Sequence, residues 1–137
     1  MLDVFEAVRT GLAPHYTVEC EIGAGGMARV FLAVERHPPR KVAIKVMKPG
    51  FSSAAFRARF TREIELTSEL RHPHIVPILS AEECLFVPEG PDDLCYYVMP
   101  YVEGESLRQR LLREKRLPLR DALQITREVA DALQFAH

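Results

Sequence analysis

The sequence predicts an α+β fold, in which a five-stranded antiparallel sheet with one packed helix is followed by two further helices. Three observations support this fold class. A glycine-rich turn separates two strand-like segments near the N-terminus, short β-branched and aromatic runs return at three later places, and apolar residues beyond position 52 recur at helical spacing. The length of 137 residues and a hydrophobic content of 47% suit one compact domain with its own core.

Residues 1–15 form a lead-in before the sheet. Their apolar residues recur at helical spacing, so we expect a short amphipathic helix or a frayed end that Pro14 terminates. The residues in question are Val4, Phe5, Val8 and Leu12. A first hairpin is expected over residues 16–35, and residues 36–40, with two prolines, then turn the chain into a strand at 42–46.

The turn of the first hairpin is a glycine-rich stretch around which the chain is organised. Three glycines in four positions indicate a backbone that comes close to a ligand and directs its N–H groups at it, most often at phosphate oxygens. The stretch comprises Ile22, Gly23, Ala24, Gly25, Gly26, Met27, Ala28, Arg29 and Val30. Taken alone, it is equally compatible with a flexible hairpin that binds nothing. A dinucleotide-binding turn would have to open a helix, for which the following β-branched residues and Pro38 leave no room.

Lys45 and Glu63 are candidate partners in an ion pair. Lys45 lies within the apolar strand at 42–46, and Glu63 lies on the apolar face of a helix expected over residues 52–71. That face is formed by Phe56, Phe60, Ile64, Thr67 and Leu70. Because a buried carboxylate is costly without a cationic partner, the pattern predicts a pair between Lys45 and Glu63. The alternative is that the Glu63 side chain reaches solvent.

The second half of the chain carries two more strands and two helices. Strands are expected at 78–83 and 94–99, with a loop at 84–93 between them. Ser106-x-x-Gln109 reads as a capping box for a helix at 107–113, and Pro118 opens the last helix, from about Leu119 onward. His72 and His74 flank a proline without a carboxylate or cysteine at ligand spacing, so we interpret them as structural and expect no metal site.

In this order, the motifs resemble those of the eukaryotic-like serine/threonine protein kinases of bacteria. The resemblance runs from about Tyr16 to the last residue. It rests on the glycine-rich stretch, V-A-I-K at 42–45, Phe60-x-Arg62-Glu63, Leu70-x-His72-Pro73-x-Ile75-Val76 and Tyr97–Gly104. It implies a kinase N-lobe over residues 16–102, the start of a helical C-lobe over 103–137, and ATP with Mg²⁺ as cofactors. In the family, the lysine contacts the α- and β-phosphates and is held by the glutamate.

The resemblance also implies an adenine site in the hinge that follows the last strand. Met99 would be the gatekeeper, the Pro100 carbonyl and the Val102 N–H would bind the adenine edge, and three apolar residues would enclose the ring: Ile22, Val30 and Ala43. Pro100 replaces the glutamate commonly found there, which removes only an N–H that the adenine does not use. The ribose contact falls near Ser106, for which we expect helix capping as the main role.

The implied activity is ATP-dependent phosphoryl transfer to Ser or Thr hydroxyls of a protein in the full-length parent. The H-R-D-x-x-x-x-N loop and the D-F-G magnesium site are absent from these 137 residues, so the segment alone is expected to be inactive, with the metal ligands beyond its end. The alternative is a pseudokinase-like nucleotide-binding or scaffold module without catalysis. A small-molecule kinase is a weaker alternative, because such enzymes usually lack the Leu-x-His-Pro and hinge patterns.

Composition bounds the partners and the compartment. With 18 Lys and Arg against 19 Asp and Glu, the formal net charge is −1, which indicates neither a nucleic-acid nor a membrane partner. Three cysteines lack metal-like spacing, and no segment has the pattern of a signal peptide or a membrane span. We therefore expect a cytoplasmic segment, with a downstream membrane anchor of the parent left open. The sequence does not identify the protein substrate.

Overall fold

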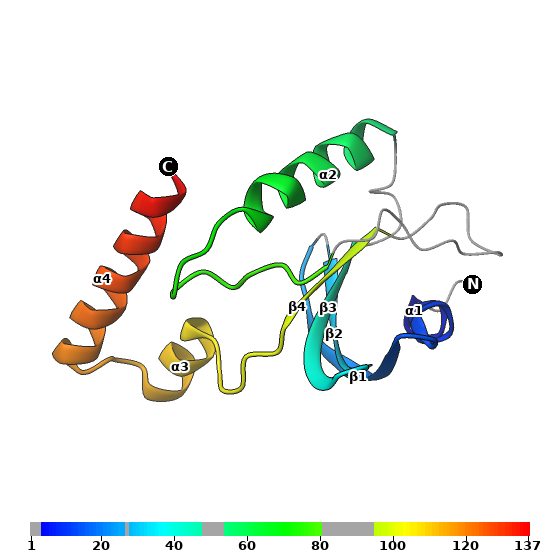
Figure 1. The fold of residues 1–137 in the computed structure, drawn as a ribbon. Coiled ribbons are helices and arrows are strands. Elements are labelled where there is room, and N and C mark those ends of the chain that lie inside the picture. The colour runs from blue at the N-terminus through cyan, green and yellow to red at the C-terminus, as the bar shows by residue number, and fades with distance from the viewer. Residues whose placement is uncertain (1–3, 27, 48–53, 81–94) are drawn as a thin grey trace. The chain divides into compact units, whose positions relative to one another are not determined.

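The computed structural model of the chain describes residues 4–26, 28–47, 54–80 and 95–137 (Figure 1). The chain divides into two compact units. The first contains Met1–Glu69 and Pro77–Tyr101, and the second contains Leu70–Val76 and Val102–His137.

An antiparallel sheet of four strands in the order β1-β2-β3-β4 forms the centre of the first unit. Its strands are β1 (Tyr16–Ala24), β2 (Ala28–Arg36), β3 (Pro39–Met47) and β4 (Tyr96–Pro100). The predicted first hairpin, the strand containing Lys45 and the strand that leads into the hinge are therefore confirmed. β3 lies between β2 and β4, pairing with β2 over its whole length and with β4 from Val42 to Val46, so the lysine is carried by an inner strand.

The strand expected at residues 78–83 is only partly described. Leu79 N–H donates to the Val98 carbonyl and Val98 N–H donates to the Ser80 carbonyl, both at 2.8 Å, so this segment runs beside β4. Ser80 forms a single antiparallel bridge with Val98. Residues 81–94 lie outside the described residues, and the described part of the sheet therefore has four strands and this bridge instead of five strands.

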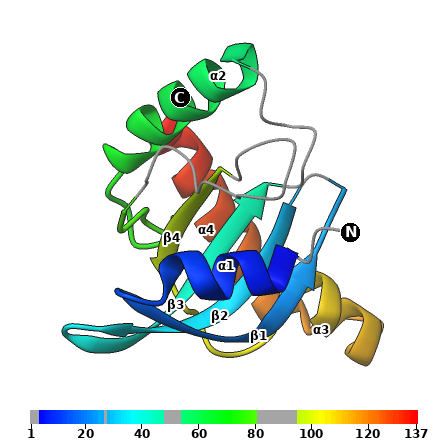
Figure 2. The same cartoon turned by 90° about the vertical axis from the view of Figure 1, so that its right-hand side faces the viewer.

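Helix α1 (Val4–Leu12) covers one face of the sheet, as Figure 2 shows. Val4, Val8 and Leu12 are buried in one apolar cluster with residues from all four strands: Val18, Phe31, Ala33, Val42, Ile44, Val46, Tyr96 and Val98. The amphipathic helix predicted for the lead-in is confirmed. Because its apolar stripe packs against the sheet, the lead-in is a docked helix and not a frayed end.

Helix α2 (Ala54–Ser68) contacts the opposite face through an aromatic pair. The Phe60 ring lies 6.1 Å from the ring of Tyr97, whose side chain alternates along β4 with the α1-facing residues Tyr96 and Val98. The predicted apolar face of α2 is confirmed, since Phe60 is buried and Phe56, Ile64 and Thr67 are half-buried.

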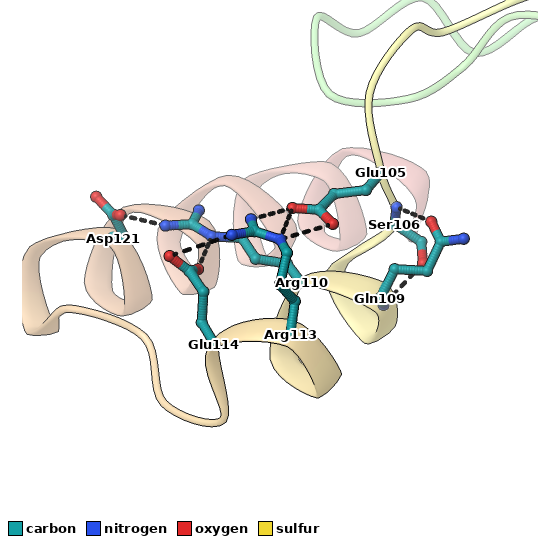
Figure 3. Close-up of polar contacts among 7 residues, drawn as sticks. All are labelled: Glu105, Ser106, Gln109, Arg110, Arg113, Glu114 and Asp121. Atoms are coloured by element: carbon teal, nitrogen blue, oxygen red, sulfur yellow. Dashed lines mark hydrogen bonds and ion pairs between the residues drawn. The ribbon is translucent and has the colours of Figure 1, made fainter.

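The second unit contains α3 (Leu107–Glu114) and α4 (Leu119–Ala136). The predicted capping box is present at the start of α3 (Figure 3): Gln109 N–H donates to Ser106 Oγ at 3.1 Å, and Ser106 N–H donates to Gln109 Oε1 at 2.8 Å. His72 Nδ1 accepts a hydrogen bond of 3.1 Å from His74 N–H within a turn, a structural use of this histidine. Over the described residues, no helix combines the length and apolar character that crossing a bilayer requires.

Candidate functional site

The glycine turn between β1 and β2 has an open backbone. Gly25 N–H donates to the Ala28 carbonyl at 2.9 Å and so closes the turn. A Cβ atom placed on Gly25 or Gly26 would meet nothing within 4 Å, and among the described glycines it is Gly104 that has a positive φ. Neither packing nor backbone conformation therefore demands glycine at these two positions. Their bare backbone leaves space through which a ligand can approach closely.

The strand register gathers four of the predicted site residues on one face. Val42, Ile44 and Val46 of β3 belong to the α1-facing cluster, so Ala43 and Lys45 between them face the other way. Val30 of β2 pairs with Lys45, and Met99 of β4 pairs with Ala43. A small residue, a lysine and two apolar residues from three strands therefore share the face opposite α1: Ala43, Lys45, Val30 and Met99.

Lys45 lies on the side of the sheet that α2 contacts. Its Nζ atom is 5.9 Å from the centre of the Tyr97 ring, which in turn contacts Phe60. Glu63 follows Phe60 by three residues on α2, but its side chain lies outside the described residues, as does the whole of Met27. The ion pair between Lys45 and Glu63 therefore stays a prediction.

The remaining residues of the predicted adenine site are spread over both units. Ile22 falls at the irregularity in register between Glu21 and Gly23 and is 43% exposed. Pro100 ends β4 opposite Val42. Val102, 67% exposed, and the capping residue Ser106 belong to the second unit, which the structure describes separately from the sheet.

The side chain of Arg29 lies on the α1 face of the sheet, away from Lys45. Its guanidinium group is 5.3 Å from the centre of the buried Phe31 ring and is bound by the carboxylate of Glu21, with N–O distances of 2.5 and 3.1 Å. Only the backbone of Arg29 can therefore act together with the glycine turn. Glu21 is not among the site residues predicted from the sequence, although an acidic and a basic residue that flank a predicted turn are a signal for a cross-strand pair.

A charged network ties α3 to its neighbours in the second unit (Figure 3). Arg110 binds Glu114 at 2.5 Å and Asp121, on α4, at 2.6 Å, and Arg113 binds Glu105. The hydrogen bond from Arg113 lowers the pKa of the Glu105 carboxyl, and the bonds to Glu114 and Asp121 raise the pKa of Arg110. In the described part of the chain, no group of three His, Cys, Asp or Glu side chains is arranged to hold a metal ion.

Comparisons with known proteins bear on the family to which the chain belongs. The family model of the protein kinase domain matches residues 16–137. The serine/threonine-protein kinase PknA of Mycobacterium tuberculosis is 39% identical over 127 residues, which are 92% of this chain and 29% of PknA. PrkC of Bacillus subtilis, also a serine/threonine-protein kinase, is 35% identical over 92% of this chain and 18% of its own length.

A solved structure shows the same fold. The crystal structure of the M. tuberculosis PknI kinase domain (C20A mutant) superposes with a TM-score of 0.73 at 31% identity, covering 90% of this chain and 48% of that one. The chain therefore spans less than a third of these curated relatives and about half of a solved kinase domain. The family match, the N-lobe type of sheet and the order of the motifs agree, and the chain belongs to the protein kinase domain family.

Proposed function

We propose that this chain is the ATP-binding part of a serine/threonine protein kinase, which transfers the γ-phosphoryl group of ATP to Ser or Thr hydroxyls of a protein. One observation carries the proposal. Lys45 lies directly opposite Val30 in the register, where β2 leaves the glycine turn, so a cation lies near a turn whose Gly25 and Gly26 leave open space for a ligand. That combination suits a polyphosphate, and relatives named as serine/threonine-protein kinases favour ATP as its source.

Each residue of the site has a role in this proposal. The loop from Gly23 to Arg29 covers the phosphates, Lys45 binds the α- and β-phosphates, and Glu63 holds Lys45. Ile22, Val30 and Ala43 enclose the adenine, and Met99, Pro100 and Val102 bind its edge. Ser106 caps α3 and contacts the ribose as a second role. Mg²⁺ accompanies ATP, and its protein ligands are expected outside these 137 residues.

The division of labour along the chain follows from these roles. Residues 16–102 supply the lobe that binds the nucleotide, and residues 103–137 begin the helical lobe. Because the catalytic aspartate of the family is not among these 137 residues, a polypeptide of this length should bind ATP without transferring phosphate. A pseudokinase-like module would share every feature described here. A radiolabelled-phosphate assay on the full-length protein distinguishes the two, because an active kinase transfers the label and a pseudokinase does not. We propose a cytoplasmic location for this segment.

The proposal is tested by binding of a fluorescent ATP analogue, mant-ATP with Mg²⁺, to this chain. Replacing Lys45 by Met should weaken binding by more than about tenfold, because a charge-assisted contact to phosphate is lost. Lys41→Met is the matched control, since Lys41 is an exposed lysine on the same strand, and it should bind as the wild type does. Failure of the wild type to bind, or equal binding by both variants, would overturn the proposal.

A further inference from the structure

Glu21 and Arg29 form a two-point ion pair at the base of the glycine turn. Arg29 Nη2 lies 2.5 Å from Glu21 Oε2 and Arg29 Nε lies 3.1 Å from Glu21 Oε1. The pair crosses from β1 to β2 on a diagonal, because Glu21 is the register partner of Phe31, two residues beyond Arg29. Both side chains are partly exposed, Arg29 at 26% and Glu21 at 33%. Such fork-shaped contacts to a carboxylate have a defined geometry and resist rotation of either side chain.

The glycine turn next to this pair is held by few of the contacts that the structure describes. Register is irregular between Glu21 and Gly23, and the turn is closed by the hydrogen bond from Gly25 to Ala28. Cβ positions on Gly25 and Gly26 would be surrounded by open space, so these residues have no packing to lose when the loop moves. The position of the turn therefore depends on how firmly the two strands are held together at its base.

The pair is itself held in place from the α1 side. The Arg29 guanidinium lies 5.3 Å from the centre of the fully buried Phe31 ring, and the Phe5 ring of α1 lies 5.8 Å from that same ring. Contact between a guanidinium and an aromatic ring is attractive, and α1 is anchored in the core by Val8. Because this assembly occupies the face opposite Lys45, it cannot contact a ligand bound beside Lys45.

We propose that Glu21 and Arg29 are positioning residues that hold the described residues of the turn, 22–26 and 28, in the conformation that receives the phosphates of a nucleotide. This inference rests on the function proposed above. Loss of the pair should let the turn open more often and shorten the residence of the nucleotide without removing any ligand contact. Partly exposed ion pairs contribute little individually, so an effect of about two- to fivefold is expected.

Charge reversal provides the test, with Glu21→Arg, Arg29→Glu and the double variant carrying both changes. Hydrogen exchange of the amides in residues 22–28, without nucleotide, should be about two- to fivefold faster in each single variant. Dissociation of mant-ATP with Mg²⁺, measured by stopped flow, should accelerate by a similar factor. The double variant restores opposite charges across the hairpin and should return both rates toward those of the wild type.

A second cross-strand pair supplies the matched control. Glu35 and Arg40 are register partners that bind each other beside the β2–β3 turn. This turn lies at the end of β2 opposite the glycine turn. Glu35→Arg should lower the thermal midpoint about as much as Glu21→Arg while leaving both rates for the glycine turn unchanged. A purely structural role for Glu21 and Arg29 would make the two sites behave alike.

The outcomes separate this inference from the function on which it rests. If the wild type binds mant-ATP but exchange and dissociation are unchanged in the single variants, the positioning role is wrong and the nucleotide site stands. If the wild type does not bind mant-ATP, the proposed function fails, and with it the positioning role. Faster rates in the single variants that the double variant does not reverse would also contradict the pairing, because charge complementarity is its physical basis.

Discussion

The Nζ atom of Lys45 lies 5.9 Å from the ring centre of Tyr97, its register partner on β4. The same ring lies 6.1 Å from that of Phe60, a buried residue of α2. The lysine, the tyrosine and the helix therefore meet on one face of the sheet. Glu63 follows Phe60 by three residues along α2, and its pairing with Lys45 is a prediction that substitution can test.

Replacing Glu63 by Gln should weaken the binding of mant-ATP with Mg²⁺ by about three- to tenfold, because the Lys45 ammonium loses the carboxylate that orients it. Glu65→Gln is the control, since Glu65 is exposed on the same helix. In the double variant with Lys45→Met, the second substitution should add almost nothing to the first. Full additivity of the two effects would show that Glu63 acts independently of Lys45.

Replacing Leu12 by Ala should lower the free energy of unfolding by about 2 to 5 kcal/mol, the usual cost of removing a buried leucine side chain. Leu12 is 4% exposed within the cluster that joins α1 to the sheet. Urea unfolding monitored by circular dichroism measures the change, and Thr10→Ala, at an exposed position of α1, should cost far less. Equal stability of the two variants would mean that α1 does not contribute to the core.

Replacing Ser106 by Ala should destabilise the α3 region by about 1 kcal/mol, because the side-chain acceptor for the Gln109 N–H is lost. Ser106→Thr keeps a hydroxyl and should retain most of the stability. Comparing mant-ATP with its 2′-deoxy counterpart, labelled on the 3′ oxygen, tests the ribose role separately. If Ser106 contacts the ribose, the alanine variant should discriminate less between these two nucleotides than the wild type does.

The pKa of Glu105 predicts a loss of stability in acid. The Arg113 hydrogen bond holds this pKa below its ordinary value of 4.5, so the native state binds its proton more weakly than the unfolded chain does. The resulting stabilisation is present above pH 4.5 and is lost as pH falls through the lower native pKa. Carboxyl NMR should show Glu105 titrating at higher pH in Arg113→Gln than in the wild type. Arg108→Gln, at an exposed arginine of α3, should leave the titration unchanged.

The regular elements could be predicted because their signals are local. The short apolar run around Lys45 predicted β3, the spacing of Phe56 and Phe60 predicted the buried face of α2, and Ser106 with Gln109 predicted a cap that forms as expected. Each depends on periodicity or on partners within four residues. Chain geometry alone brings such partners together.

The contacts that escaped prediction join residues whose proximity depends on the path of the chain. Arg110 reaches Asp121 only because the connection after α3 returns the chain beside it, and Glu21 meets Arg29 only through the register of the hairpin. Long charged side chains can choose among several partners of similar energy, so sequence alone does not select one. The docking of α1 could not be predicted for the same reason. The spacing of its apolar residues indicates an amphipathic helix but does not identify the surface against which that helix packs.

Successive residues of β3 face opposite sides of the sheet and are therefore constrained by different neighbours. Positions 42, 44 and 46 pack on the side of α1, where any aliphatic side chain of suitable shape suffices. Positions 43 and 45 face the other side of the sheet. There we expect the ligand to constrain the size of the side chain at position 43 and its charge at position 45. A single-codon insertion just before position 42 would exchange the two sets, driving the ammonium group into the aliphatic layer and moving the aliphatic side chains to the opposite face. Drift within this strand should therefore proceed by substitution and hardly ever by a change of length.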